Sequence, residues 1–344
     1  MLMHGGDFDI GARNEIGEVD IPRMREGGVT AVFFSVYTSA VRNTELEAVQ
    51  DALEIIDTVR REVGRFPDEL TLAFSSADIE AARQAGRISI LIGVEGGHMI
   101  NSSLGVLRSL WRLGARYLTL THSRDTPWAG SSGTDSNAGL SEFGREVIAE
   151  LNRLGMLVDV SHVSDQTFWD TVEASTAPII ASHSSARSIC NHGRNMTDEM
   201  IRATADRGGV VHVNYYNTFL DCAYAERSRL WESENPDVGR GEGIGARTRA
   251  KLAAIGRPPL GTLLDHFEHV ARVGGIEAVG LGSDFDGVDG ELPEGMEDIS
   301  KLPALVSGLA ERGFGDEDIE KILGLNSLRV FRDVESASRA GEDP

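Results

Sequence analysis

Short apolar runs rich in β-branched residues alternate with longer segments of helical periodicity along most of the chain. The runs are continuous rather than alternating in polarity, which is typical of parallel strands buried on both faces. Because a parallel strand needs a crossover to reach the next one, this order predicts an α/β fold with a parallel sheet. The seven predicted strands span residues 29–36, 88–94, 117–121, 156–160, 178–182, 210–213 and 278–282.

Helical segments fill most of the gaps between these runs, and several are followed by glycine, a common helix terminator. They span residues 44–63, 103–113, 142–154, 165–175, 197–207 and 260–273. The order fits a (β/α)8 TIM-type barrel, which needs eight strands. We therefore expect strand 1, which should precede Asp20, to be missing or incomplete. One barrel domain is expected over residues 1–344, with a loop insertion at about 217–259 and a C-terminal helical segment at about 298–334.

Charge and cysteine content exclude several classes of protein. With 33 Lys and Arg against 54 Asp and Glu, the formal net charge is −21, which argues against nucleic-acid partners. No signal peptide, membrane span or lipid-anchor tail is visible, so we expect a cytoplasmic protein with no membrane anchor. Cys190 and Cys222 form no CxxC pair, and we expect no disulfide framework.

Five of the seven predicted strands run directly into a histidine or a carboxylate. In chain order these residues are Glu95, His122, His162, His183 and Asp284. In a parallel barrel the carboxyl ends of the strands share one face, where the active sites of barrel enzymes lie. The five side chains are therefore predicted to converge on one site.

A single histidine at a strand end is usually a hydrogen-bonded structural residue, but this pattern recurs on several strands. Burying Glu95, His122, His162 and His183 without partners would cost several kcal/mol. Imidazole nitrogen and carboxylate oxygen are ordinary Zn²⁺ ligands, so the pattern predicts a metal site. We interpret the remaining histidines as structural.

Three further features have a functional and a structural interpretation. Glu95 could bridge two metal ions, and the glycines at 96 and 97 would let the backbone approach closely, or they could simply form a loop. Arg194 could bind a substrate carboxylate with two hydrogen bonds, or lie on the surface. Asp284 and Asp286 could be an acid/base pair or a capping pair.

Ordered motifs over residues 19–334 resemble the membrane dipeptidase (renal dipeptidase) family, the M19 metallopeptidases. The matching segments include DIPRMREGGV at 20–29, VEGG at 94–97, RYLTLTHS at 116–123, DVSHVS at 159–164, SHSSA at 182–186, RN at 194–195, GSDFDGV at 282–288 and NSLRVF at 326–331. Agreement in so many segments, in the same order along the chain, is specific to this family. The resemblance implies a (β/α)8 barrel that holds two zinc ions.

The resemblance also implies a role for each matching residue. Glu95 would bridge the zinc ions, with His162 and His183 on the second of them. His122 would contact the substrate and its tetrahedral intermediate, and Asp284 would be the general acid/base. The remaining implied residues are Arg194, holding the substrate carboxylate, and Tyr216, lining the substrate pocket. The implied reaction is hydrolysis of dipeptides by a metal-bridging hydroxide, and the family suggests a homodimer.

One departure from the family concerns the first zinc ion. The family carries a His-x-Asp pair at the end of strand 1, and this sequence has none, since the stretch from His4 to Asp7 has the wrong spacing. We expect that the chain as given starts just after the missing pair. The alternatives are a non-catalytic or single-zinc relative, or another barrel amidohydrolase such as a deaminase or lactonase.

Overall fold

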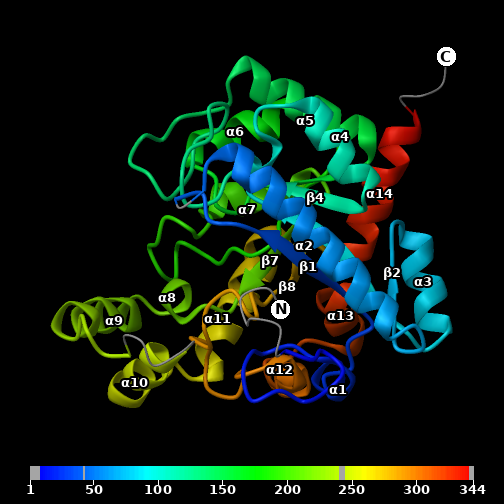
Figure 1. Ribbon diagram of the computed structural model, residues 1–344. Helices are drawn as coiled ribbons and strands as arrows, with labels where there is room; N and C mark the ends of the chain where they lie inside the picture. The colour runs from blue at the N-terminus through cyan, green and yellow to red at the C-terminus, as the bar shows by residue number, and fades with distance from the viewer. Residues whose placement is uncertain (1–7, 42, 240–244, 341–344) are drawn as a thin grey trace.

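The computed structural model describes residues 8–41, 43–239 and 245–340, and its centre is a curled sheet of eight parallel strands (Figure 1). Seven strands are paired in the order β1-β3-β4-β5-β6-β7-β8, and β2 pairs with β3 as well. The strands are β1 Ala31–Tyr37, β2 Leu70–Leu72, β3 Ile88–Glu95, β4 Ala115–Thr119, β5 Leu157–Asp159, β6 Ile179–Ala181, β7 Val210–Asn214 and β8 Val279–Gly282.

The sheet is a partial barrel, which confirms the predicted α/β barrel class. Among the described residues no strand joins β8 to β1, so the barrel is open between them. The strand that sequence analysis missed is β2, which pairs with β3 through Leu70↔Ile88 to Leu72↔Ile90. With only three residues, β2 is too short to give a recognisable apolar run.

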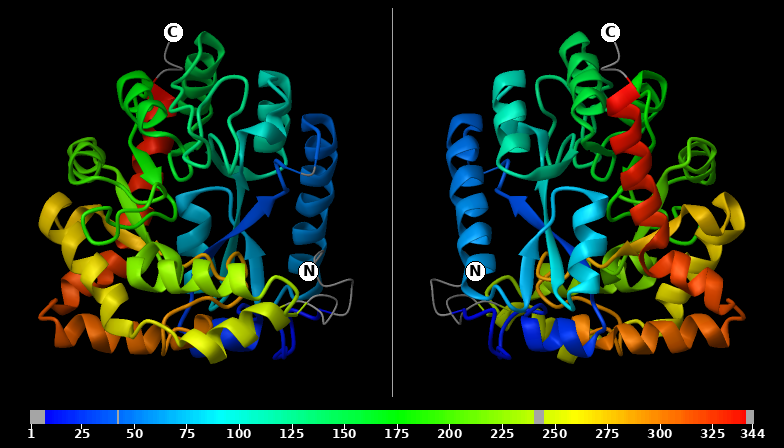
Figure 2. Two further views of the ribbon diagram at one scale, coloured as in Figure 1. Left: turned by 90° about the vertical axis from the view of Figure 1, so that its left-hand side faces the viewer. Right: turned by 90° about the vertical axis from the view of Figure 1, so that its right-hand side faces the viewer.

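Helices surround the sheet on its outer side, as the two views in Figure 2 show. Their ends carry ordinary signals: Thr44 and Glu47 form a capping box at the start of α2, and Gly155 ends α5 at φ 65°. The helices are α1 Ile21–Glu26, α2 Glu45–Arg65, α3 Ser76–Gln84, α4 Leu104–Arg112, α5 Glu142–Leu154, α6 Asp165–Ala174, α7 Asp198–Asp206, α8 Asn217–Leu220, α9 Cys222–Glu234, α10 Ala246–Ile255, α11 Leu260–Gly274, α12 Leu302–Glu311, α13 Asp316–Glu320 and α14 Asn326–Ala340.

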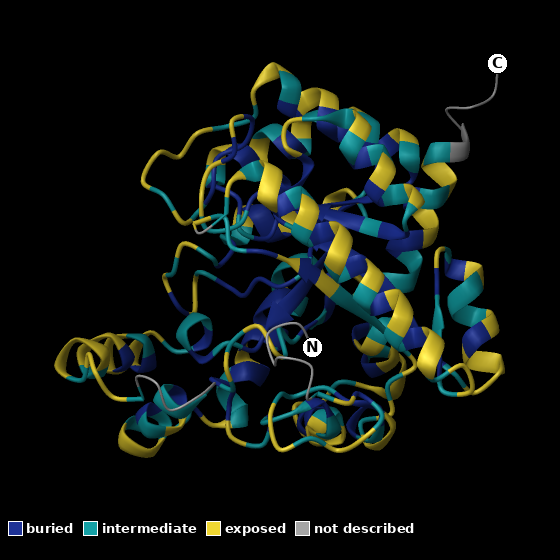
Figure 3. Ribbon diagram, in the orientation of Figure 1, coloured by how far each residue is buried: buried dark blue, intermediate teal, exposed yellow. Residues whose placement is uncertain are grey.

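The hydrophobic core lies between the sheet and these helices. Figure 3 shows strands that are mostly buried and a helix α2 on which buried and exposed residues alternate. The buried stripe of α2 comprises Ala48, Ala52, Ile56, Val59 and Val63, spaced three or four residues apart. That spacing places one face of the helix against the core. This packing holds the strands in place and thereby fixes the positions of the residues at their ends.

Between β7 and α11 the described residues form three helices, and α9 and α10 project together from one side of the molecule (Figure 1). The first part of this segment is joined covalently to the loop after β6 by a disulfide between Cys190 and Cys222. The expectation that the two cysteines form no disulfide framework is therefore wrong. Their separation of 32 positions in the sequence concealed the pairing, because sequence spacing alone does not reveal which loops meet in space.

A buried ion pair fixes the N-terminal segment beside α1. Asp20 is fully buried and Arg23 is 5% exposed. The Asp20 carboxylate accepts hydrogen bonds from Arg23 Nε at 2.8 Å and, as the N-cap of α1, from the Arg23 backbone N–H at 2.9 Å. Burial opposes ionisation of Asp20, but its bonds with Arg23 outweigh burial, and its pKa lies below the ordinary value of 3.8.

We expect Asp20→Ala to lower the free energy of unfolding by about 3–5 kcal/mol, because it leaves the Arg23 guanidinium buried without its partner. Urea denaturation at pH 7 measures the loss. Because the pKa of Asp20 is lowered by folding, its contribution is complete above pH 3.8 and disappears as the pH falls through the folded-state pKa. Arg13→Ala, which breaks an exposed pair with Glu26, is the control and should cost less than about 1 kcal/mol. Equal losses in the two variants would contradict the assignment.

Candidate active site

Four predicted site residues meet at the carboxyl end of the sheet. Glu95 is the last residue of β3, and His122, His162 and His183 follow β4, β5 and β6 by two or three residues. Glu95 Oε1 lies 3.5 Å from His122 Nε2, 3.2 Å from His162 Nε2 and 3.4 Å from His183 Nε2. The His162 and His183 Nε2 atoms are 2.8 Å apart. The predicted convergence of these residues is observed.

The spacing of these atoms matches the requirements of a shared metal ion. Ligands bonded to one tetrahedral zinc ion at 2.0–2.1 Å lie about 3.3 Å from one another. Glu95 Oε1, His162 Nε2 and His183 Nε2 form a triangle with sides of 2.8, 3.2 and 3.4 Å. Glu95, His122 and His162 also form a group whose ligand atoms lie within 4.8 Å of one another. The donor set, one carboxylate and imidazole nitrogens, therefore fits a divalent metal ion.

The electrostatics of the cluster keep the nitrogen lone pairs of His122 and His162 available. Burial lowers the pKa of His122 to about 4, although Glu95 opposes this, and burial also places the pKa of His162 well below its ordinary value. Burial acts in the same direction on His183, but the carboxylates of Glu95 and Asp284 outweigh it and raise the pKa of His183. His122 and His162 are therefore neutral near pH 7, which is the form in which imidazole binds metals.

The turn after Glu95 needs its two glycines. Gly96 has φ 129°, a backbone conformation that residues other than glycine rarely adopt. A Cβ on Gly97 would lie 2.2 Å from the Leu120 carbonyl oxygen, so the backbone after β3 packs directly against the segment after β4. This close approach brings Glu95 and His122 together, as the sequence suggested.

Polar residues that sequence analysis assigned no role orient the cluster. The Ser35 hydroxyl donates to Glu95 Oε2 at 2.7 Å, and Ser182 Oγ lies 2.8 Å from His183 Nδ1. Ser182 in turn donates to the fully buried carboxylate of Asp159 at 2.6 Å. A hydroxyl that donates to a carboxylate accepts from the imidazole, so His183 carries a proton on Nδ1 and presents Nε2 to the cluster. Asp159 begins the DVSHVS motif at 159–164, and this motif was the only feature of the sequence that pointed to it.

Asp284 lies beside the cluster, two residues after β8 ends. Its Oδ2 accepts a hydrogen bond from Asn214 Nδ2 at 3.0 Å, and its backbone has φ 60°, an unusual conformation for a residue other than glycine. Burial and the nearby Glu95 carboxylate raise the pKa of Asp284, against the opposing influence of His183 and Arg194. Asp286, by contrast, is exposed and accepts a hydrogen bond from the Glu18 backbone N–H at 2.5 Å.

Arg194 and Tyr216 come from two neighbouring loops. The Arg194 guanidinium donates to the His183 carbonyl oxygen at 3.1 Å and lies 5.3 Å from the centre of the Phe219 ring. Burial lowers the pKa of Arg194 to about 10, although the carboxylates of Asp284 and Glu95 oppose this shift. The guanidinium therefore stays charged near pH 7. The Tyr216 ring packs against the Phe219 ring, with 4.8 Å between their centres, and Phe219 is the side chain that contacts the Arg194 guanidinium. The stretch from His4 to Asp7, whose spacing does not fit a His-x-Asp pair, lies outside the described residues.

Solved structures with the same fold include several dipeptidases. The structure described as that of the probable dipeptidase PvdM from Pseudomonas aeruginosa matches with a TM-score of 0.83 at 23% identity, over 95% of this chain and 91% of that one. A metallopeptidase from Rhodobacter sphaeroides, solved with a phosphinate mimic of the dipeptide L-Ala-D-Ala, matches with a TM-score of 0.80 at 25% identity, over 93% and 91%. The first of these shows the fold alone.

Among curated proteins, Dipeptidase 3 from Rattus norvegicus is 37% identical over 325 residues. The match covers 93% of this chain, and the chain spans 59% of the length of that relative. The family model of the membrane dipeptidases matches residues 2–343.

These matches bear on location as well. The expected cytoplasmic location is contradicted by the similarity to membrane dipeptidases and to Dipeptidase 3. The Cys190–Cys222 disulfide points the same way, because reducing compartments disfavour such bonds. In the part of the chain that the structure describes, no helix combines the length and apolar character needed to cross a bilayer. The match over nearly the whole sequence establishes that this chain belongs to the membrane dipeptidase family, peptidase family M19, whose members are metallopeptidases.

Proposed function

We propose that the protein is a zinc-dependent dipeptidase whose metal is held by Glu95, His162 and His183. The observation that carries this proposal is the triangle of ligand atoms with sides of 2.8–3.4 Å at the carboxyl end of the sheet. The family membership and the dipeptide mimic bound by the Rhodobacter sphaeroides relative support dipeptides as the substrate class. A divalent ion at this position would supply Lewis acidity and a readily deprotonated water.

The protein's own groups then divide the remaining work. Asp284, with its raised pKa, accepts a proton from the attacking water and delivers it to the leaving amine. His122, whose Nε2 atom lies 3.5 Å from Glu95 Oε1, is proposed to contact the oxygen on which negative charge develops. Tyr216 and Phe219 form the aromatic wall on which the Arg194 guanidinium rests.

Arg194 is proposed to bind the free carboxylate of the dipeptide. Its charge is retained on burial, and guanidinium pairs with carboxylate through two parallel hydrogen bonds. A carboxylate held there limits the substrate to short peptides, because the scissile bond must reach the metal ligands from that anchor. A zinc-binding protein without catalysis is the second candidate, favoured by the absence of a His-x-Asp pair from the printed sequence and by the edge between β8 and β1 that is open among the described residues.

We expect Arg194→Ala to raise KM for alanyl and glycyl dipeptides about 10- to 100-fold, because hydrogen bonds to charged groups contribute about 1.5–3 kcal/mol. Steady-state kinetics on a dipeptide panel, with metal analysis of the same samples, measures this. Arg194→Lys should recover only part of the affinity, since an ammonium group lacks the planar fork. Unchanged dipeptide kinetics in Arg194→Ala would refute the role, and an inactive wild-type protein that retains zinc would favour the second candidate.

A further inference from the structure

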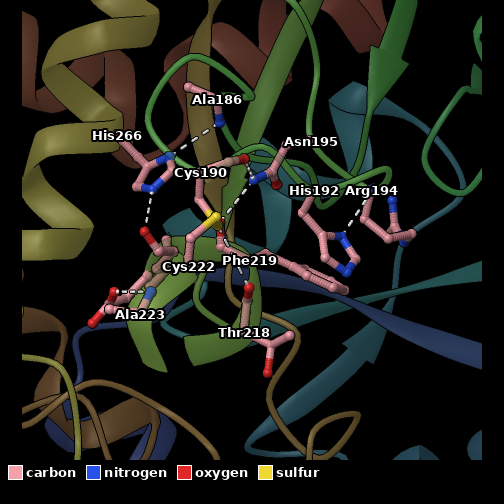
Figure 4. The surroundings of a disulfide bond; sticks show 12 residues. Ala186, Cys190, His192, Arg194, Asn195, Thr218, Phe219, Cys222, Ala223 and His266 are labelled. Atoms are coloured by element: carbon pink, nitrogen blue, oxygen red, sulfur yellow. Dashed lines mark hydrogen bonds between the residues drawn. A yellow bond between two sulfur atoms is a disulfide. The ribbon is translucent and has the colours of Figure 1, made fainter. Parts of the chain in front are cut away.

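Three of the contacts that fix the loop carrying Arg194 to the segment after β7 involve a disulfide and two buried polar side chains (Figure 4). One is the disulfide between Cys190, in that loop, and Cys222, the first residue of α9. The second is the side-chain amide of Asn195, and the third is the imidazole of His266 on α11. No role in the proposed reaction has been given to any of them.

Asn195 makes the most direct of the bridges. It is 1% exposed, and its Nδ2 donates to the Cys190 carbonyl oxygen at 2.9 Å and to the Phe219 carbonyl oxygen at 2.7 Å. One amide group therefore closes the loop on itself and joins it to the residue whose ring supports the Arg194 guanidinium. Its Oδ1 has no hydrogen-bond partner among the described residues. Burying this acceptor costs free energy, and the Asn195 amide is buried nonetheless.

His266 makes a parallel bridge a few residues away. Its Nδ1 accepts from the Ala186 backbone N–H at 3.0 Å, so its proton is on Nε2, which donates to the Leu220 carbonyl oxygen at 3.0 Å. Burial lowers the pKa of His266 to about 4, so the ring is neutral and this pattern persists near neutral pH. The two bridges and the disulfide hold the same pair of segments together.

We propose that Asn195 is a positioning residue for substrate binding, which, with the Cys190–Cys222 disulfide, locks Arg194 and Phe219 in the relative geometry that captures the dipeptide carboxylate. The inference rests on the proposed function. Among the described residues, the Arg194 guanidinium makes one hydrogen bond, to the His183 carbonyl oxygen, so its direction depends on the loop that carries it and on the Phe219 ring beside it. Misplacing a bidentate donor by about 1 Å costs much of its binding.

The test compares a dipeptide with its C-terminal amide, which lacks the carboxylate. In Asn195→Ala we expect KM for the free dipeptide to rise about five- to tenfold, with kcat within about twofold, because two hydrogen bonds that orient Arg194 are lost. The ratio of kcat/KM for the dipeptide to that for the amide should fall by a similar factor. A purely structural defect would lower both substrates equally and leave the ratio unchanged. Zinc content should equal that of the wild type.

Two further variants complete the design. Ser188→Ala removes a side-chain hydrogen bond from the same loop to Asp198, away from the segment after β7, and should leave KM and the ratio unchanged. The double variant Cys190→Ser with Cys222→Ser removes the covalent bridge and should shift KM and the ratio in the same direction as Asn195→Ala.

The outcomes separate the two proposals. A folded Asn195→Ala with wild-type KM and ratio overturns the inference, and if that variant does not fold, the double serine variant with wild-type values overturns it. A wild-type protein that hydrolyses the dipeptide and its amide equally well would instead refute carboxylate binding by Arg194.

Discussion

His183→Ala is expected to lose at least one bound zinc ion per chain and to have dipeptidase activity reduced by about 10³-fold or more. The variant removes one corner of the ligand triangle and leaves Glu95 Oε1 and His162 Nε2 without the third donor that a structural or catalytic zinc site needs. Metal analysis by mass spectrometry after gel filtration measures the loss, and dipeptide hydrolysis measures its consequence.

A second histidine provides the matched control for this experiment. His269 on α11 pairs with Asp198 at 2.7 Å and lies in a different network from the ligand triangle. His269→Ala should retain the zinc content and most of the activity, although some stability is lost with the hydrogen bond to Asp198. Full zinc content in a folded His183→Ala would show that His183 is not a ligand, whatever the activity of the variant.

Asp284→Asn should lower kcat about 10²- to 10⁴-fold while the bound zinc is retained, because the amide cannot accept and return a proton. The substitution keeps the shape of the side chain, and the asparagine oxygen can still accept from Asn214. The required measurements are kcat by steady-state assay and zinc per chain on the same preparation.

Asp286→Asn is the control, because Asp286 lies two residues away in the same loop but is exposed. Its kcat should stay within a few-fold of the wild type. If Asp284→Asn retained wild-type kcat, or if the two variants lost equal activity, Asp284 would not be the proton carrier.

Sequence reasoning succeeded where a local pattern has one physical cause. Continuous apolar runs required buried parallel strands, and a polar residue at each strand end had to reach the same face, so Glu95, His162 and His183 could be placed together without coordinates. The β2 strand gave no such pattern, because three residues are too few to show one.

The parts that could not be predicted depend on which loops meet. The Cys190–Cys222 bond and the Asn195 bridge join segments that are neighbours only after the sheet has curled. Asp159 could not be recognised as a partner of Ser182 for the same reason, since buried polar networks follow from tertiary packing rather than from periodicity.

The central claim is that Glu95, His162 and His183 bind one zinc ion between them. Diffraction data collected at the zinc absorption edge from crystals of the full chain, equilibrated with Zn²⁺, test it directly. We expect an anomalous peak about 2.0–2.2 Å from Glu95 Oε1 and from the Nε2 atoms of both histidines. Ordered side chains at this position with no anomalous peak between them, or zinc bound only elsewhere on the molecule, would contradict it.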